Sequence, residues 1–120
     1  MKPLRWTRIS KDDVRDFPKE VKRDIGFALR EAQRGGKHPD AKPLQGFGGA
    51  SVLEVVENYD GDTYRAVYTV RFAEAIYVLH AFKKKSTQGS KTAQRDINLI
   101  KARLQDAQED YETWLMAGKP

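Results

Sequence analysis

The sequence predicts an α+β protein in which an N-terminal strand and a helical pair pack on a small antiparallel sheet, closed by a C-terminal helix. Three observations support this class. Apolar residues recur at helical spacing towards both ends of the chain, strand-like segments follow one another in the middle, and glycine-containing turns separate the two kinds of pattern. With 120 residues, 39% of them hydrophobic, the chain can form one modest core, so we expect a single domain over 1–120.

The first third of the chain predicts a strand followed by helical structure. Residues 4–9 alternate apolar and polar side chains, as a short strand does. Ser10 is a good helix N-cap, and an apolar stripe at helical spacing then continues as far as Ala32. Pro18 interrupts this stripe, so we expect a bent helix or a pair of helices over residues 11–34.

The middle of the chain predicts a loop and a three-stranded meander. Residues 35–50 hold five glycines and two prolines, which indicates a loop. Three strand-like segments follow, at 51–58, 63–71 and 75–82. The turn Asp60–Gly61 is typical of a tight hairpin, because both residue types accept positive φ. The short connections imply that all three strands pair antiparallel.

A last helix is predicted to begin at Ser90 or Thr92 and to run to about Ala117. Its apolar stripe comprises Ala93, Ile97, Ile100, Leu104, Ala107 and Tyr111. So narrow a stripe suits packing on the chain's own sheet, with a partner chain as the alternative.

The charge distribution indicates a polyanionic partner. The formal net charge is +5, and the segment between Phe82 and Asp96 carries five positive charges and no acid: Lys83, Lys84, Lys85, Lys91 and Arg95. A strand that ends in a cationic loop presents charge to phosphates, so nucleic acid is the first partner to consider.

Composition also excludes several functional classes. The chain has no cysteine, which removes disulfides, thiolate catalysis and thiolate metal sites. Only two histidines are present and no phosphate-loop or dinucleotide pattern occurs, so we expect no metal and no cofactor. The apolar runs are too short for a membrane span and no signal pattern opens the chain, so we expect a cytoplasmic protein that does not bind a membrane.

Three motifs resemble one group of bacterial toxins. They are Tyr64-Arg-Ala-Val-Tyr68, Ile76-Tyr-Val-Leu-His-Ala-Phe-Lys-Lys-Lys-Ser-Thr87 and Thr92-Ala-Gln-Arg-Asp-Ile97. Their order and spacing are similar to those of the phage-related HigB-like branch of the RelE/ParE toxin superfamily, and the resemblance covers nearly the whole chain.

The resemblance implies a RelE-like fold and the role of toxin in a type II toxin-antitoxin system. It further implies a metal-independent endoribonuclease that cleaves mRNA on the ribosome, and a cognate helix-turn-helix antitoxin (HigA-like) as partner. Because one fold can carry several activities, two alternatives stay open. One is a non-catalytic ParE-like toxin that inhibits DNA gyrase, and the other is an antitoxin-binding module without nuclease activity.

The resemblance also indicates catalytic candidates. Arg65 matches the arginine that the RelE family uses against phosphate, and a mid-strand arginine that lined a cleft would suit this role. The alternative for Arg65 is the solvated face of the sheet. Lys84 matches a second cation of the family, with Lys83 and Lys85 beside it to hold the flanking backbone. The alternative there is an ordinary solvated lysine run.

Proton transfer is harder to assign. Histidine is the usual residue for proton transfer near neutral pH, so His80 is a third catalytic candidate, but its alternation with Ile76, Val78 and Phe82 also suits a core histidine. His38 and Tyr68 are weaker candidates for the same step. The family often has a tyrosine after the basic loop, where this chain has Gln88, Gly89 and Ser90, so the general base stays open. The expected RNA-binding residues are Lys83, Lys85, Thr87, Lys91 and Arg95, with Thr92 either a donor to phosphate or a helix cap.

Overall fold

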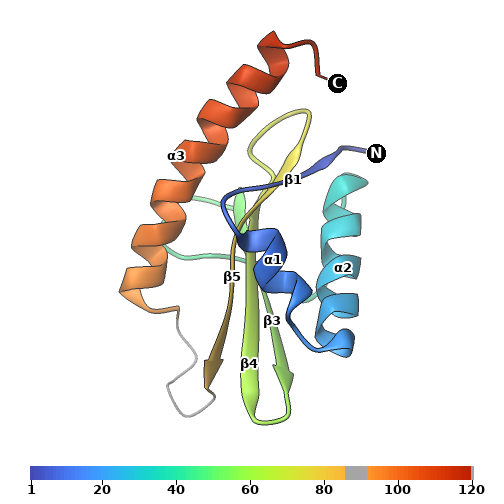
Figure 1. The fold of residues 1–120 in the computed structure, drawn as a ribbon, viewed down its shortest axis with the longest axis vertical. Helices are drawn as coiled ribbons and strands as arrows, with labels where there is room; N and C mark the ends of the chain where they lie inside the picture. The colour runs from blue at the N-terminus through green and yellow to red at the C-terminus, as the bar shows by residue number, and fades with distance from the viewer. Residues whose placement is uncertain (86–91, 120) are drawn as a thin grey trace.

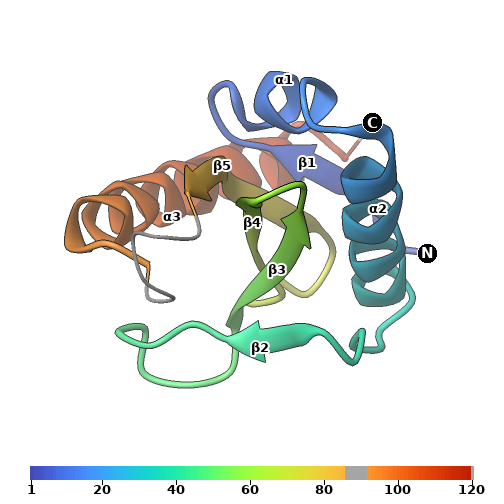
Figure 2. The ribbon, with the colours of Figure 1, turned by 90° about the horizontal axis from the view of Figure 1, so that it is seen from below.

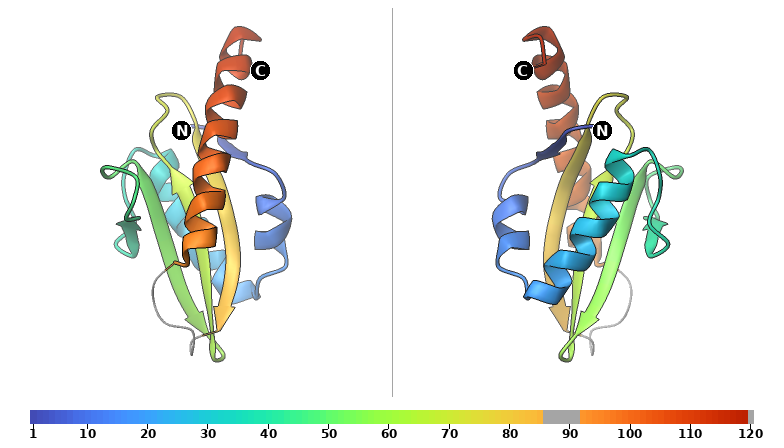
Figure 3. Two further views of the ribbon diagram at one scale, coloured as in Figure 1. Left: turned by 90° about the vertical axis from the view of Figure 1, so that its left-hand side faces the viewer. Right: turned by 90° about the vertical axis from the view of Figure 1, so that its right-hand side faces the viewer.

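A five-stranded sheet forms the middle layer of the protein, with one helix on each face and a third, short helix along one edge (Figure 1, Figure 2). The computed structural model describes residues 1–85 and 92–119. Its elements in chain order are β1 (Leu4–Trp6), α1 (Ser10–Arg15), α2 (Lys19–Gln33), β2 (Ala41–Pro43), β3 (Val52–Tyr59), β4 (Asp62–Thr69), β5 (Ile76–Lys85) and α3 (Gln94–Met116). Seen from the sides, α3 crosses one face of the sheet, α2 lies on the other, and α1 lies beside β5 at the edge (Figure 3).

The sheet has the strand order β1-β5-β4-β3-β2. Strands β3, β4 and β5 form the predicted antiparallel meander. The β3–β4 turn is Asp60–Gly61, with φ of 51° and 83°, as the sequence indicated. The sheet is mixed rather than wholly antiparallel, because β1 pairs parallel to β5.

The predicted helical pair is confirmed, with Pro18 immediately before the first turn of α2. Two details before it differ from the prediction. The first strand ends at Trp6, because the chain turns at Arg8 with φ of 51°. Ser10 is the first residue of α1 and not its N-cap, since its buried hydroxyl donates 2.8 Å back to the Thr7 carbonyl.

Two strand boundaries also differ from the prediction. The segment 35–50 was expected to be a loop throughout, yet Ala41–Pro43 pairs with β3 as a short edge strand. Such a strand is held by main-chain pairing and tolerates a proline at the edge, so side-chain pattern does not reveal it. The last strand continues to Lys85 because β4 is long enough to pair with it, Asp62 lying opposite Lys85.

Each face of the sheet has its own apolar cluster. The cluster under α2 contains Val21, Ile25, Leu29, Val55, Tyr68, Ile76 and Val78 among others. The cluster under α3 contains Val52, Val67, Tyr77, Leu79, Ile100, Ala107, Tyr111 and Trp114 among others. The stripe of α3 therefore packs on the chain's own sheet.

Neither a membrane span nor a metal site is found in the described residues. No helix there is both long enough and apolar enough to span a bilayer. The same residues contain no group of three or more His, Cys, Asp or Glu side chains placed to hold a metal ion.

Candidate functional site

A β-bulge in β5 decides which side chains meet on the α3 face of the sheet. Val67 pairs with His80 but Tyr68 pairs with Val78, so Leu79 is an extra residue in β5. The bulge reverses the alternation beyond it. His80 therefore shares a face with Val67, whose neighbours pack under α3, and not with Val78, which packs under α2. The predicted alternation of His80 with Ile76 and Val78 is wrong for this reason.

The same register brings Arg65 and Lys84 to one face. Arg65 lies opposite Phe82, and Lys84 lies opposite Thr63. Directly opposed residues point to the same side of a sheet, as do residues two apart along a strand. Arg65 and Lys84 are thus diagonal neighbours on the α3 side, and the Phe82 ring stacks on His80 beside them with 4.6 Å between ring centroids.

Arg65 is buried and paired with a carboxylate. Its side chain is 3% exposed, and Nη1 donates to Glu54 Oε1 at 3.1 Å and to Thr92 Oγ1 at 3.3 Å. The Thr92 hydroxyl in turn donates to Glu54 Oε2. Arg65 is therefore not on a solvated face. The free-energy cost of burying the Arg65 charge is offset by the carboxylate of Glu54, because a buried ion needs a partner of opposite charge.

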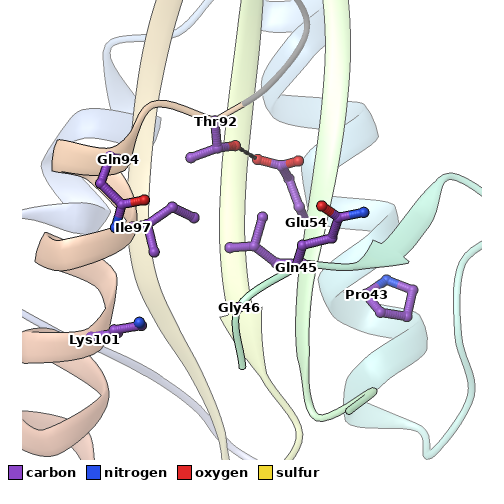
Figure 4. A pocket seen from close by; sticks show the side chains of 9 residues that line it. Pro43, Gln45, Gly46, Glu54, Thr92, Gln94, Ile97 and Lys101 are labelled. Atoms are coloured by element: carbon purple, nitrogen blue, oxygen red, sulfur yellow. Dashed lines mark hydrogen bonds between the residues drawn. The ribbon is translucent and has the colours of Figure 1, made fainter. Parts of the chain in front are cut away.

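Glu54 and Thr92 form part of the wall of a cavity on this face. The cavity has a volume of about 540 Å³ and lies between the segment that follows β2 and the first turns of α3 (Figure 4). Its other lining residues are Pro43, Leu44, Gln45, Gly46, Gln94, Ile97 and Lys101. Arg65 is not among them. Its charge lies behind the carboxylate and the hydroxyl that face the cavity.

The other predicted cations do not all lie on this face of the sheet. Lys84 is half-buried in β5, and Lys83 is exposed, with Nζ 3.8 Å from Asp62 Oδ2. Lys83 lies opposite Tyr64, which packs under α2, so it belongs to the other face. Arg95 is exposed in the first turn of α3.

The RNA-binding roles of all five candidates stay predictions, and three of the five are described in part or not at all. Thr87 and Lys91 lie outside the described residues. Lys85 is the last residue of β5, and only its main chain is described.

His80 is clamped between two charged residues of α3. Arg103 Nη1 donates to His80 Nδ1 at 3.0 Å, and also to the Leu79 carbonyl at 3.1 Å. Since guanidinium is only a donor, Nδ1 accepts and Nε2 carries the proton, which it donates to Asp96 Oδ1 at 3.1 Å. Both ring nitrogens form hydrogen bonds to residues of α3, and His80 is only 7% exposed. We call this contact, His80 with Asp96 and Arg103, the latch between β5 and α3.

The electrostatics of this latch favour a neutral imidazole. Burial lowers the pKa of His80 below its ordinary value of 6.5. The hydrogen bond to Asp96 opposes this shift, whereas the nearby charge of Arg103 adds to it. A proton on Nδ1 would also point at the guanidinium. The ring is therefore held in one tautomer.

The two weaker candidates lie away from the cavity. Tyr68 is fully buried under α2, and burial raises the pKa of its hydroxyl to about 12. Within the described part of the chain that hydroxyl has no hydrogen-bond partner. His38 precedes β2, where its Nδ1 accepts a hydrogen bond from the Asp40 amide at 3.1 Å.

Three residues of the site were not singled out from the sequence: Glu54, Asp96 and Arg103. A signal for Glu54 was present, because the Asp60–Gly61 turn fixes the register that sets Val56 opposite Arg65. Glu54 is two residues from Val56 and so shares its face. Asp96 and Arg103 had no comparable signal in the sequence. Both contact His80, and the bulge in β5 decides which face of the sheet His80 lies on.

The sequence matches one protein-family model over most of its length. The family model described as phage-derived protein Gp49-like (DUF891) matches residues 12–105. The chain belongs to this Gp49-like family. No curated protein sequence matches it significantly.

Two solved structures show that the Gp49-like chain has the RelE fold. The isolated E. coli RelE toxin has 16% sequence identity and a TM-score of 0.53, over 85% of this chain and 98% of that one. A double arginine-to-alanine mutant of E. coli RelE in the free state gives the same identity and TM-score, over 73% of this chain and 86% of that one. The predicted RelE-like α+β fold is therefore confirmed.

Proposed function

We propose that this Gp49-like protein is the toxin of a type II toxin-antitoxin system and cleaves mRNA on the ribosome without a metal ion. One observation carries the proposal: a RelE fold places an arginine–carboxylate pair, Arg65 and Glu54, beside a cavity on the α3 face. In this proposal residues 1–120 act as one toxin domain in the cytoplasm. The partner is a helix-turn-helix antitoxin of the HigA type.

The chemistry needs a base, and Glu54 supplies a candidate. Among the described residues, each Glu54 oxygen accepts one hydrogen bond, from Arg65 or from Thr92. A carboxylate has about four lone-pair sites. Glu54 therefore retains the capacity to accept the proton of a ribose 2′-hydroxyl. The contacts from Arg65 and Thr92 fix the direction in which it does so.

With Glu54 as the base, the bonds formed and broken during cleavage can be stated. The 2′-oxygen attacks the adjacent phosphorus as its proton passes to Glu54, and a 2′,3′-cyclic phosphate forms. The bond from phosphorus to the 5′-oxygen breaks, and that oxygen takes a proton from water. Negative charge grows on the phosphoryl oxygens, where Lys84 on the same face and the field of Arg65 stabilise it.

Arg65 and His80 act by holding other groups in place. Arg65 orients Glu54, and its charge reaches the cavity from behind that carboxylate. His80 ties β5 to the start of α3, and that helix follows Thr92 directly. Thr92 is in turn a hydrogen-bond partner of Glu54, so the position of α3 and the orientation of the base are linked.

Burial of Arg65 also favours an alternative. A neutralised, 3% exposed arginine suits a non-catalytic toxin that inhibits a protein such as DNA gyrase, or a module that only binds an antitoxin. Expression of the protein in cells distinguishes the ribonuclease from these alternatives. Primer extension on cellular mRNA is expected to show discrete cuts for the native chain, whereas intact transcripts with supercoiling-defective DNA would favour gyrase.

Matched variants sharpen that experiment. Arg65→Ala and Lys84→Ala are expected to abolish the cuts at equal protein level. Arg71→Ala and Lys37→Ala remove the same residue types from exposed positions outside the site and are expected to leave the cuts unchanged. Equal cutting by all four variants would contradict the site assignment.

A further inference from the structure

The cavity beside Glu54 is larger than the space that one phosphodiester group would fill. About 540 Å³ is within the range of small-molecule sites. A single carboxylate and one hydroxyl account for the reacting end only. The remaining walls come from the segment after β2 and from α3, and they differ in chemistry from that end.

Two apolar residues, Leu44 and Ile97, line the cavity and belong to the same apolar cluster under α3. Leu44 is buried in the segment after β2. Ile97 projects from α3 (Figure 4). Gly46 comes close to that helix, since a Cβ added there would lie 3.9 Å from the Ile97 side chain. Its φ of 100° is one that residues with a side chain rarely adopt. The segment therefore passes close to α3 at this glycine.

The rim of the cavity carries polar groups that can read a planar heterocycle. Gln45 and Gln94 contribute two exposed side-chain amides, each with a donor and an acceptor side by side. Gln94 Nε2 donates to Asn98 Oδ1 at 2.9 Å, which holds that amide at the rim. Lys101 also lines the cavity and adds a positive charge.

We propose that this cavity is a nucleobase subsite, which holds the unpaired RNA base next to the phosphodiester presented to Glu54. The proposal rests on the ribonuclease function proposed above and adds to it the origin of sequence preference. The base lies on the apolar surface that Leu44 and Ile97 contribute to the cavity. The amide of Gln45 hydrogen-bonds its edge, and Lys101 neutralises the adjoining phosphate.

Binding tests the subsite independently of cleavage. Backbone amide NMR spectra of the full chain are recorded while each of the four 5′-mononucleotides is added. The expected result is saturable shifts at Gly46, Ile97 and Lys101 whose size differs among the four bases. Shifts confined to Lys83 and Lys84, equal for all four, would overturn the subsite.

Cleavage profiles test its effect on specificity. Gln45→Leu removes the exposed amide and keeps the side chain's approximate size. The expected change is about a tenfold loss of discrimination among bases next to the cut, the scale of one amide–base contact. Gln105→Leu makes the same change at an exposed position of α3 outside the cavity and is expected to leave the profile unaltered.

The two experiments fail in distinguishable ways. If the native chain cuts no RNA but base-dependent shifts appear at Gly46, the ribonuclease function is wrong while base binding in the cavity stands. If the native chain cuts RNA but Gln45→Leu keeps its profile and Gly46 does not shift, the ribonuclease function stands and the subsite is wrong.

Discussion

The two faces of the sheet are packed with different chemistry. The face under α2 is closed by aliphatic and aromatic side chains, with Ile25 and Tyr68 among those fully buried. Among the described residues, the face under α3 combines a similar apolar cluster with three buried basic residues, Arg65, His80 and Arg103.

This difference indicates where function resides. Buried ionic groups give no more stability than well-packed apolar side chains of the same volume, because desolvation offsets their attraction. A fold that needed only a core would repeat the chemistry of the α2 face on both sides. The charged residues of the α3 face are thus the groups to test for activity, and those of the α2 face the groups to test for stability.

The largest effect is expected for Glu54→Gln on the α3 face. Loss of the base should lower the rate of RNA cleavage by about 10²–10⁴-fold, the usual contribution of general acid–base catalysis. The rate is measured per folded molecule, because the change also weakens the partner of a buried arginine.

The matched control for that change lies on the same strand. Glu57 is opposite Tyr64, so it points to the α2 side. Glu57→Gln is expected to cleave at the native rate. Equal losses for Glu54→Gln and Glu57→Gln would remove the distinction between the two faces.

The next effect is on the α2 face, where Ile25→Ala should act on stability alone. Ile25 is fully buried, and truncation of such a side chain costs about 2–5 kcal/mol. Urea denaturation measures the loss, with Ile9→Ala as the exposed control at about 0.5 kcal/mol or less. Slower cleavage by folded Ile25→Ala protein would contradict the division of roles.

A smaller effect is expected for His80→Gln, and it depends on pH. The change removes the ring that links Arg103 to Asp96, at a cost of about 1–3 kcal/mol for the buried donors left behind. The pKa of His80 is lowered in the folded state, so the unfolded chain takes up the proton first as pH falls. Stability is therefore complete above about pH 6.5 and is lost as pH falls towards the folded-state value.

Urea denaturation at several pH values between 7.5 and 5 checks this sign. His80→Gln should lose the pH dependence, and His38→Gln should keep it. If His80→Gln protein is as stable as the native chain but no longer cleaves RNA, His80 is a catalytic residue and not a latch.

The smallest effect is expected for Arg8→Ala. Arg8 Nε lies 3.2 Å from Asp106 Oδ2, but both side chains are more than a third exposed. Solvent screening limits such a pair to about 0–1 kcal/mol. The melting temperature in low and high salt measures it. A larger loss would show that the contact between the turn after β1 and α3 contributes more than its exposure suggests.

Most of the secondary structure could be predicted from patterns of neighbouring residues. Pro18 marked the break between α1 and α2, the Asp60–Gly61 turn marked the meander, and the stripe of α3 marked the face that it packs. These features depend on residues close together in sequence. Local chemistry is therefore enough to predict them.

The site was predictable only in part, because its geometry depends on pairing between distant segments. Arg65 and Lys84 were chosen by resemblance, and their shared face depends on a bulge that no local pattern marks. The same bulge turned His80 towards Asp96 and Arg103. Burial of Arg65 could not be read from its strand, since it depends on Glu54 and Thr92 from two other segments.

The chemistry of the RNA ends tests the central claim most directly. The full-length protein is added to ribosomes programmed with a defined mRNA, and the ends of any fragments are identified. Cleavage through the 2′-hydroxyl predicts a 2′,3′-cyclic phosphate on one fragment and a 5′-hydroxyl on the other, with neither formed by Glu54→Gln. Intact mRNA, or fragments with 5′-phosphate ends, would contradict the account.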